Sequence, residues 1–396
     1  MKVYIVGTGM EGEKTLTAEA MEAIEKADIL IGAERMLKPF MNSCKEVFIS
    51  YRSDYIARKI NECVFEAGAV LMSGDCGFFS GTKKLLSALE GHEVVIVPGV
   101  SSVSYFCSKL GISYENMKFV TLHGRSSNIA VNVRMNEKCF FLLGGESSAR
   151  DICQRLCEYG MGDIDVHIGS DLGYETENII IGKASEFTDI TESGLTVLIT
   201  ENKEYLNYLP SAIDDAGFKR SEIPMTKSEV RCIAVSKMDI CKDSIVWDIG
   251  CGTGSVSVEA AFRCPDGRVF AFDKKREAAE LTAENARHFG CDNIIVAEGS
   301  CPEILSDAPA PDKVFIGGTA GKMSAVFDSV YTKNPIAEVV VTAVSLETLQ
   351  AAVDCFDKYS DSPDIVQISV TRTKKLGTHT MLQAQNPVFI ISGRLS

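Results

Sequence analysis

Glycine-rich loops of two different builds occur in this sequence, each at the expected end of a strand. The first, VGTGMEGEKTLT, opens at Val6, and the second, WDIGCGTGSVSVEAA, opens at Trp247. Each loop follows an apolar run and precedes a helical pattern, so backbone N–H groups and a helix N-terminus can face a ligand there. We therefore expect two nucleotide-type sites in one chain, and a two-reaction enzyme is the first hypothesis.

The second loop carries the stronger signal. It reads DIGCGTG from Asp248, and its alternating glycines let the backbone approach a ligand where side chains would collide. Asp273 ends the next expected strand, RVFAFD, where a carboxylate is suited to binding two ribose hydroxyls. A dinucleotide-binding fingerprint needs its third glycine at position 255, where this chain has Ser255. A nicotinamide cofactor is therefore disfavoured. The alternative is a glycine turn that only packs a strand on a helix.

Strand and helix patterns that could position these loops alternate along both halves of the chain. In the first half the apolar runs extend from KVYIVG to LTVLIT, which favours an α/β domain with a mostly parallel sheet. The alternation is lost over residues 207–224 and restarts with SIVWDIG, forming a second, doubly wound unit. We predict two domains, 1–206 and 207–396. The halves share no sequence repeat, so duplication of one fold is not expected.

Length and composition are those of a folded protein with two cores. The chain has 396 residues, of which 45% are hydrophobic and 24% charged. Its formal net charge is −14, whereas binding to nucleic-acid phosphates requires an excess of Lys and Arg. A nucleic-acid partner is therefore not expected, although a local basic pocket is compatible with this charge.

Membrane, secretion and metal signals are weak. No apolar stretch reaches the ~18 to 20 residues of a membrane span, and the first residues, MKVYIVGTGMEGE, lack a signal-peptide pattern. We expect a cytoplasmic protein with no membrane partner. The 14 cysteines form no CxxC pair, so most are expected to be buried thiols. The five histidines lack metal-ligand spacing, so no protein-bound metal is expected.

Four further segments of the second half are distinctive: MTKSEVR at 225–231, EGSCPE at 298–303, FIGGTAG at 315–321 and TAVSLET at 342–348. Together they resemble the decarboxylating C15-methyltransferase domain of cobalamin (corrin) biosynthesis, a class I S-adenosylmethionine (SAM) methyltransferase. The resemblance implies a Rossmann-like domain that binds SAM. It implies a cofactor site formed by Thr226, Gly250, Cys251, Gly252, Thr253, Gly254, Asp273 and Cys301.

The first half contains five distinctive segments: SGDCGFFSG at 73–81, VPGVSS at 97–102, HGR at 123–125, LLGG at 142–145 and DLGYETE at 171–177. In this order and spacing they resemble the tetrapyrrole (corrin/porphyrin) methyltransferases. The HGR segment points to the C5-methylating branch. The resemblance implies a two-lobed α/β fold with SAM in the cleft between the lobes, near Gly7, Gly9, Gly74, Asp75, Ser101 and Ser102.

His123 and Arg125 are the candidate catalytic pair of the first half, on a loop after the expected strand FVTLH. The imidazole could accept a proton, and the guanidinium could bind an acetate or propionate arm. The alternative is a capped, solvated turn. In the second half, candidates for binding carboxylate arms are Lys227, Arg231, Arg372, Lys374 and Lys375. Such a charge run is also typical of a solvated face.

Together the two resemblances imply SAM-dependent methylation of a precorrin-type ring at C5 and C15, with removal of one carboxylate. Any cobalt would be carried by the substrate. The resemblance of the two halves to these methyltransferase families also implies a homo-oligomer. The competing hypotheses are a class I methyltransferase acting on RNA or protein, and a non-catalytic SAM-binding scaffold. The absence of a basic stripe and of an NPPY- or DPPY-like motif disfavours the RNA or protein substrate.

Overall fold

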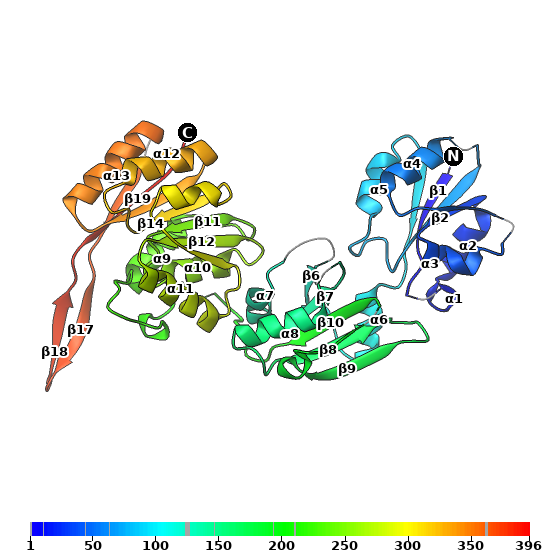
Figure 1. Ribbon diagram of the computed structural model, residues 1–396, viewed down its shortest axis with the longest axis horizontal. Coiled ribbons are helices and arrows are strands. Elements are labelled where there is room, and N and C mark those ends of the chain that lie inside the picture. Colours follow the sequence, from blue (N-terminus) through cyan, green and yellow to red (C-terminus); the bar gives the residue numbers. More distant parts are fainter. Residues whose placement is uncertain are drawn as a thin grey trace. The chain divides into compact units, whose positions relative to one another are not determined.

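Figure 1 shows the computed structural model of the chain. The structure describes residues 2–10, 12–43, 45–62, 64–122, 127–145, 147–192, 194–209, 211–360 and 363–396. His123 and Arg125 lie outside the described residues.

Internal contacts divide the chain into two compact units. One comprises Met1–Ser126, Lys138–Ile152 and Asp165–Glu201, and the other comprises Ser127–Glu137, Cys153–Ile164 and Asn202–Ser396. Two segments of the first half thus group with the second unit, which no sequence pattern indicated. The domain boundary between residues 206 and 207 stays a prediction.

The first sheet of the first unit is parallel, in the order β3-β2-β4-β1-β5. Its strands are β1 (Lys2–Gly7), β2 (Ile29–Gly32), β3 (Glu46–Ile49), β4 (Ala67–Met72) and β5 (Glu93–Val97). Its helices are α1 (Gly12–Thr15), α2 (Ala18–Lys26), α3 (Glu34–Leu37), η1 (Lys38–Phe40), α4 (Ser53–Glu62) and α5 (Thr82–Ala88). Ile5 and Val6 of β1 pack into different apolar clusters, so both faces of the sheet are covered.

The second sheet of this unit, in the order β6-β7-β10-β8-β9, is mostly antiparallel. Its strands are β6 (Lys118–Thr121), β7 (Lys138–Leu142), β8 (Asp165–Ser170), β9 (Asn178–Lys183) and β10 (Thr196–Glu201). The helical segments between its strands or beside it are α6 (Ser102–Leu110), α7 (Ala130–Met135), α8 (Ala149–Glu158) and η2 (Ala184–Phe187). The expectation of one mostly parallel sheet is wrong for this lobe. The short connection from β8 to β9 cannot hold the crossover that parallel neighbours need.

The second unit contains a seven-stranded sheet in the order β13-β12-β11-β14-β15-β19-β16, with only β19 antiparallel to its neighbours. Its strands are β11 (Ile245–Ile249), β12 (Arg268–Asp273), β13 (Ile294–Glu298), β14 (Lys313–Ile316), β15 (Glu338–Ala343), β16 (Asp364–Ile368) and β19 (Val388–Arg394). Its helices are α9 (Ser228–Lys237), α10 (Ser255–Arg263), α11 (Arg276–Phe289), α12 (Met323–Lys333) and α13 (Leu346–Tyr359), with the short turns η3 (Asp215–Gly217) and η4 (Glu303–Asp307).

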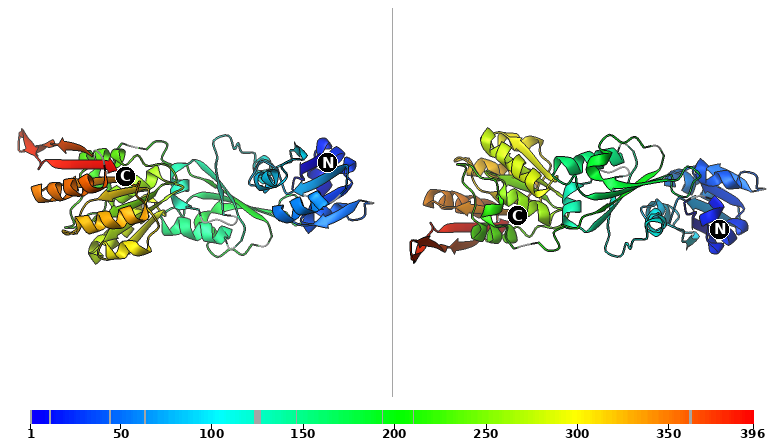
Figure 2. Two further views of the ribbon diagram at one scale, coloured as in Figure 1. Left: turned by 90° about the horizontal axis from the view of Figure 1, so that it is seen from above. Right: turned by 90° about the horizontal axis from the view of Figure 1, so that it is seen from below.

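Alternate residues of the central strands fill the two faces of this sheet. Val246 packs with residues of α9, α10 and α11, whereas the next residue, Trp247, packs with residues of α12 and α13. This alternation is the strand period of two that the apolar runs predicted. The remaining strands, β17 (Thr371–Leu376) and β18 (His379–Ala384), form a separate hairpin that extends away from the sheet (Figures 1 and 2).

Helix α7 is built into the second unit by a carboxylate of that unit. The side chain of Asp292 accepts hydrogen bonds from the backbone N–H groups of Ile129, Ala130 and Val131, at 2.7, 2.9 and 3.0 Å. The Asn128 side-chain amide donates to the carbonyls of residues 265 and 267, both at 2.8 Å. The Val131 side chain is fully buried in the core that also contains Val246. These residues are therefore part of the packing of the second unit.

Replacing Asp292 with alanine should destabilise the second unit by about 2 kcal/mol, because it removes a helix cap and leaves several N–H groups without an acceptor. Hydrogen exchange should become faster at the amides of Ile129, Ala130 and Val131. Denaturant unfolding and exchange mass spectrometry measure the two effects. The control is Asp243→Ala, at an exposed position, which should change neither. Equal stability of the two variants would contradict this role of Asp292.

Candidate functional site

The second glycine loop lies between the ends of β12 and β14. The N–H groups of Gly250 and Cys251 donate to the Phe272 carbonyl at 2.8 and 3.0 Å. Gly250 has φ +77°, and a Cβ added there would lie 2.7 Å from the backbone oxygen of Gly318. Only glycine fits this conformation and this close approach. The loop therefore presents backbone at the carboxyl end of the sheet, where ligands bind in open α/β folds.

Asp273 is held beside this loop by backbone donors. Its Oδ2 accepts from Gly252 N–H at 3.1 Å and its Oδ1 from Lys275 N–H at 2.9 Å. These two bonds fix the orientation of the carboxylate, which lines a cavity of about 680 Å³. That volume lies in the range of small-molecule sites.

The structure brings together six of the eight candidate residues of the second half. Those that line the cavity are Thr226, Gly250, Cys251, Gly252, Asp273 and Cys301. Burial, assisted by the negative charge of Asp273, raises the pKa of the Cys301 thiol to about 11, so this thiol is neutral at neutral pH.

The other two candidates, Thr253 and Gly254, lie behind the loop rather than in the cavity lining. The Thr253 carbonyl accepts from the Asn285 side chain at 2.8 Å. A Cβ on Gly254 would lie 2.7 Å from the side chain of Thr282. Both positions therefore pack the loop against α11, so their structural role is to hold its backbone conformation.

Sequence reasoning missed part of the cavity wall. Lys274, Lys275 and Lys322 line it, as do Val370, Gln385 and Asn386 at the base of the β17–β18 hairpin. The two lysines after Asp273 could have been found from their adjacency to that residue. The hairpin residues are far from the loop in the sequence, and no local motif marks them.

Asp248, which begins the glycine motif, does not line the cavity and is fully buried. Ser257 Oγ donates to its Oδ2, and no described residue donates to its Oδ1. Burial raises the pKa of Asp248 to about 7, and the hydrogen bond from Ser257 offsets only part of this effect. In the folded chain the carboxyl group thus keeps its proton at pH values well above its usual pKa of 3.8.

Replacing Asp248 with asparagine should change how stability depends on pH. In the wild type, the folded chain retains a proton that the unfolded chain releases, so stability is lost as the pH rises from about 4 to about 7. The Asp248→Asn variant has no such proton. The difference in unfolding free energy, wild type minus variant, should therefore decrease across this window and level off above it. Urea unfolding at a series of pH values measures it, and parallel curves would contradict the assignment.

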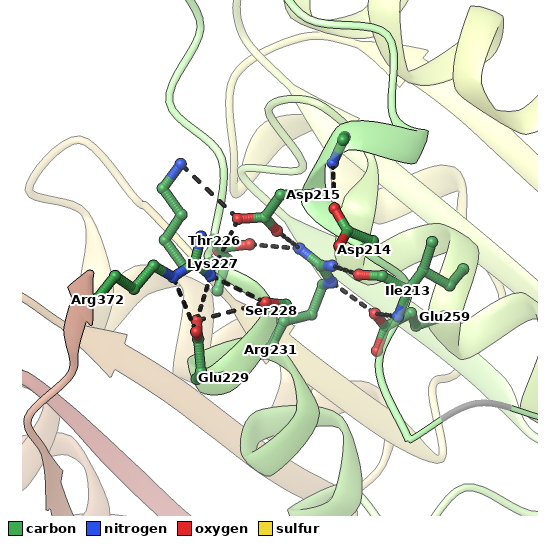
Figure 3. Close-up of polar contacts among 11 residues, drawn as sticks. Ile213, Asp214, Asp215, Thr226, Lys227, Ser228, Glu229, Arg231, Glu259 and Arg372 are labelled. Carbon is green, nitrogen blue, oxygen red and sulfur yellow. Dashed lines mark hydrogen bonds and ion pairs between the residues drawn. The ribbon is translucent and has the colours of Figure 1, made fainter. Parts of the chain in front are cut away.

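Arg231 is a structural residue, so the prediction that it binds a carboxylate arm of the substrate is wrong (Figure 3). Its side chain is fully buried, with Nε donating to Glu259 at 2.6 Å and Nη1 to Asp215 at 3.2 Å. Nη1 also donates to the Thr226 carbonyl at 2.6 Å, and Nη2 to the Ile213 carbonyl at 2.5 Å. With its donors engaged and no exposed surface, Arg231 cannot reach a substrate carboxylate.

Arg372 is also engaged, at the base of the hairpin. Its Nε donates to Glu229 Oε1 at 2.8 Å, and its Nη2 donates to Ser228 Oγ at 3.0 Å (Figure 3). Lys374 and Lys375 are exposed along β17. Of the five candidate cations, only Lys227 lines the cavity.

A smaller cavity, of about 200 Å³, lies in the first unit between residues of its two sheets. Three of the candidate residues line it: Gly74, Asp75 and Ser102. Its wall also includes Arg35 and Tyr174. Arg35 lies outside all the segments that carry the family resemblance, so sequence reasoning missed it.

Gly7, Gly9 and Ser101 support this cavity from outside its lining. A Cβ on Gly7 would lie 2.7 Å from the Gly99 backbone nitrogen. Gly9 and Gly74 exchange backbone hydrogen bonds of 3.0 and 2.9 Å. Ser101 Oγ accepts from Ser104 N–H at 3.2 Å and so caps α6.

Asp75 lines the cavity but is also bound to the loops that form it. Its Oδ2 accepts from Gly99 N–H at 3.0 Å, and its Oδ1 accepts from Gly77 N–H at 2.8 Å. The carboxylate therefore holds the GDCG and VPGV segments together.

None of the helices in the described part of the chain is long and apolar enough to span a bilayer. Within the same residues, no three His, Cys, Asp or Glu side chains are grouped to hold a metal ion. Most of the described cysteines are buried free thiols, as expected.

The family model for tetrapyrrole (corrin/porphyrin) methylases matches residues 2–188, and the one for the precorrin methyltransferase domain matches residues 218–394. The chain thus joins two methyltransferase domains of different fold class. A probable cobalt-precorrin-6B C15-methyltransferase (decarboxylating) of Pyrobaculum calidifontis is 39% identical over 188 residues, which cover 47% of this chain and 96% of that protein.

A relative with both parts also matches. The precorrin-6Y C5,15-methyltransferase (decarboxylating) of Sinorhizobium is 26% identical over 392 residues, which cover 97% of this chain and 94% of that protein. A crystal structure of precorrin-6Y C5,15-methyltransferase from Geobacter metallireducens is 35% identical, covering 48% of this chain and all of that one, with a TM-score of 0.45. The chain belongs to the decarboxylating precorrin C5,15-methyltransferase family, and the predicted resemblance is confirmed.

Proposed function

We propose that this chain methylates a precorrin-type tetrapyrrole at C5 and C15 and removes one acetate carboxylate as CO₂, in corrin-ring biosynthesis. SAM is the methyl donor at both sites. The observation that carries the proposal is the match to both methyltransferase families, with a two-part relative aligned along 97% of the chain. The competing hypotheses, an RNA or protein methyltransferase and a non-catalytic scaffold, receive no support from these matches.

The residues of the larger cavity fit SAM. Gly250 and Gly252 present backbone where a side chain would collide or strain the loop, and Asp273 offers an oriented carboxylate to the ribose hydroxyls. Thr226 and Cys301 would contact the cofactor from the cavity wall. When bound, SAM supplies a methyl group on a sulfonium, which needs no further activation. The protein therefore contributes mainly by positioning the ring carbon at ~3–3.5 Å from that methyl group.

Loss of the carboxylate requires a place for the electron pair of the broken C–C bond. The conjugated ring of the substrate can accept that pair, so no metal or added cofactor is required for this step. The cavity walls would contribute by partly excluding water from the leaving carboxylate. No single side chain is assigned to the decarboxylation.

For the first unit, we propose that SAM binds in the smaller cavity near Gly74, Asp75 and Ser102. The roles of His123 as proton acceptor and Arg125 as carboxylate ligand stay predictions. So do a cytoplasmic location and a homo-oligomer. No partner other than the tetrapyrrole is proposed.

The test incubates the purified chain with a precorrin-6 type substrate and SAM that carries a labelled methyl group. Mass spectrometry counts the methyl groups and the lost carboxylate, and NMR locates the label on the ring. We expect label at C5 and C15 and the release of one CO₂. A product methylated at other ring carbons, or the absence of methylation with active SAM and intact substrate, would overturn the proposal.

A further inference from the structure

The lining of the larger cavity has an excess of positive charge. Four lysines line it, Lys227, Lys274, Lys275 and Lys322, whereas Asp273 is the only carboxylate in the lining that the structure describes. The chain as a whole has the opposite balance, with 54 acidic and 40 basic residues. Cations gathered in one cavity of an acidic protein raise the local concentration of anionic ligands.

The four lysines lie on two sides of the glycine loop. Lys274 and Lys275 directly follow Asp273 at the end of β12. Lys322 precedes α12 after β14, which is the neighbour of β11 on the side opposite β12. Lys227 precedes α9, a helix that packs on β15 and β19. Lys227 therefore lies on the side of the loop away from Asp273, whereas the Nζ of Lys322 reaches Glu303, which follows β13.

Neither of these two lysines is held strongly by its present partner. Lys322 is 2.8 Å from Glu303 in an exposed pair, and exposed pairs contribute only about 0–1 kcal/mol. Lys227 lies 3.9 Å from Asp215, a carboxylate that already accepts from Arg231 and Arg372. Each ammonium group can therefore leave its present partner and pair with a carboxylate that enters the cavity. Neither change leaves a buried charge unpaired.

We propose that Lys227 and Lys322 bind carboxylate arms of the tetrapyrrole at the C15 site and so orient the ring for methyl transfer. The proposal rests on the proposed function, which supplies a substrate with many carboxylates. SAM carries one carboxylate, and its ribose is assigned to Asp273 on the side of the loop away from Lys227. The far side of the cavity, lined also by Val370 and Gln385, is then the place for the larger ligand.

The experiment compares Lys227→Gln and Lys322→Gln in the full chain, each with a matched arginine variant that keeps the charge. We expect each glutamine variant to raise KM for the precorrin at the C15 step about tenfold, the loss of one charge-assisted hydrogen bond. The turnover number and the Kd for SAM should stay within about twofold of wild type, and added salt should raise KM less steeply than in wild type. The arginine variants should restore most of the affinity.

The control is Lys358→Gln on α13, because Lys358 forms a comparable exposed pair, 3.0 Å from Asp328, but does not line the cavity. Its KM should not change. An unchanged KM in both glutamine variants, or a loss of SAM affinity as large as the loss of precorrin affinity, would overturn the assignment of these lysines. The proposed function would stand in that case, because the wild-type chain still turns over. A wild-type chain that does not methylate C15 would instead overturn the proposed function, and this proposal with it.

Discussion

Replacing Asp273 with alanine is expected to abolish methylation at C15 and the release of CO₂, while methylation at C5 continues. The carboxylate holds the Gly252 and Lys275 N–H groups at 3.1 and 2.9 Å and lines the larger cavity. Its loss removes the proposed ribose contacts and leaves the loop less ordered, and charge-assisted hydrogen bonds of this kind contribute about 1.5–3 kcal/mol each. SAM binding in this unit should weaken at least about a hundredfold. Mass spectrometry of the product measures the outcome.

The matched control for this variant is Asp357→Ala, at an exposed position on α13. It should form the same doubly methylated, decarboxylated product as wild type. If Asp273→Ala also forms that product at the wild-type rate, Asp273 does not bind SAM. Loss of both methylations in a folded Asp273→Ala chain would contradict the independence of the two sites.

Replacing Arg231 with methionine is expected to cause the largest loss of stability, about 3–5 kcal/mol. The side chain is fully buried and neutralises Asp215 and Glu259, whose own side chains are almost completely buried. Methionine fills much of the volume but leaves the buried Glu259 without its cation. It leaves Asp215 with only the longer contacts to Arg372 at 3.5 Å and Lys227 at 3.9 Å. The variant should also lose C15 activity, because Arg231 holds the Thr226 carbonyl beside the cavity. Denaturant unfolding of the second unit measures the stability change.

An exposed arginine provides the comparison for this effect. Arg276 pairs with Glu280 at 2.7 Å on the surface of α11, and its side chain is 76% exposed. Arg276→Met should therefore change stability by no more than about 0.5 kcal/mol. Similar losses in the two variants would show that the buried network around Arg231 does not stabilise the fold as described.

Local patterns explain why much of the second unit could be predicted from the sequence. The strand ending at Ile249, the glycine loop and the strand ending at Asp273 are close in the sequence, and parallel strands bring their carboxyl ends to one edge of the sheet. This geometry requires a glycine at position 250, because a Cβ on Gly250 would collide with the backbone of Gly318.

Contacts between distant segments could not be predicted in the same way. The charge of Arg231 is visible in the sequence and makes it a candidate for binding substrate carboxylates, whereas its partners Asp215 and Glu259 are brought together only by folding. The burial of Val131 among residues of the second unit depends on Asp292, more than 150 positions away. The antiparallel β8–β9 pair was missed because apolar runs alone do not report strand direction.

Titration of the full chain with SAM by calorimetry tests most directly the central claim that two separate sites bind the same methyl donor. We predict two SAM molecules bound per wild-type chain, and one per Asp273→Ala chain at concentrations that saturate the remaining site. A single site in the wild type, or two unchanged sites in the variant, would contradict this account.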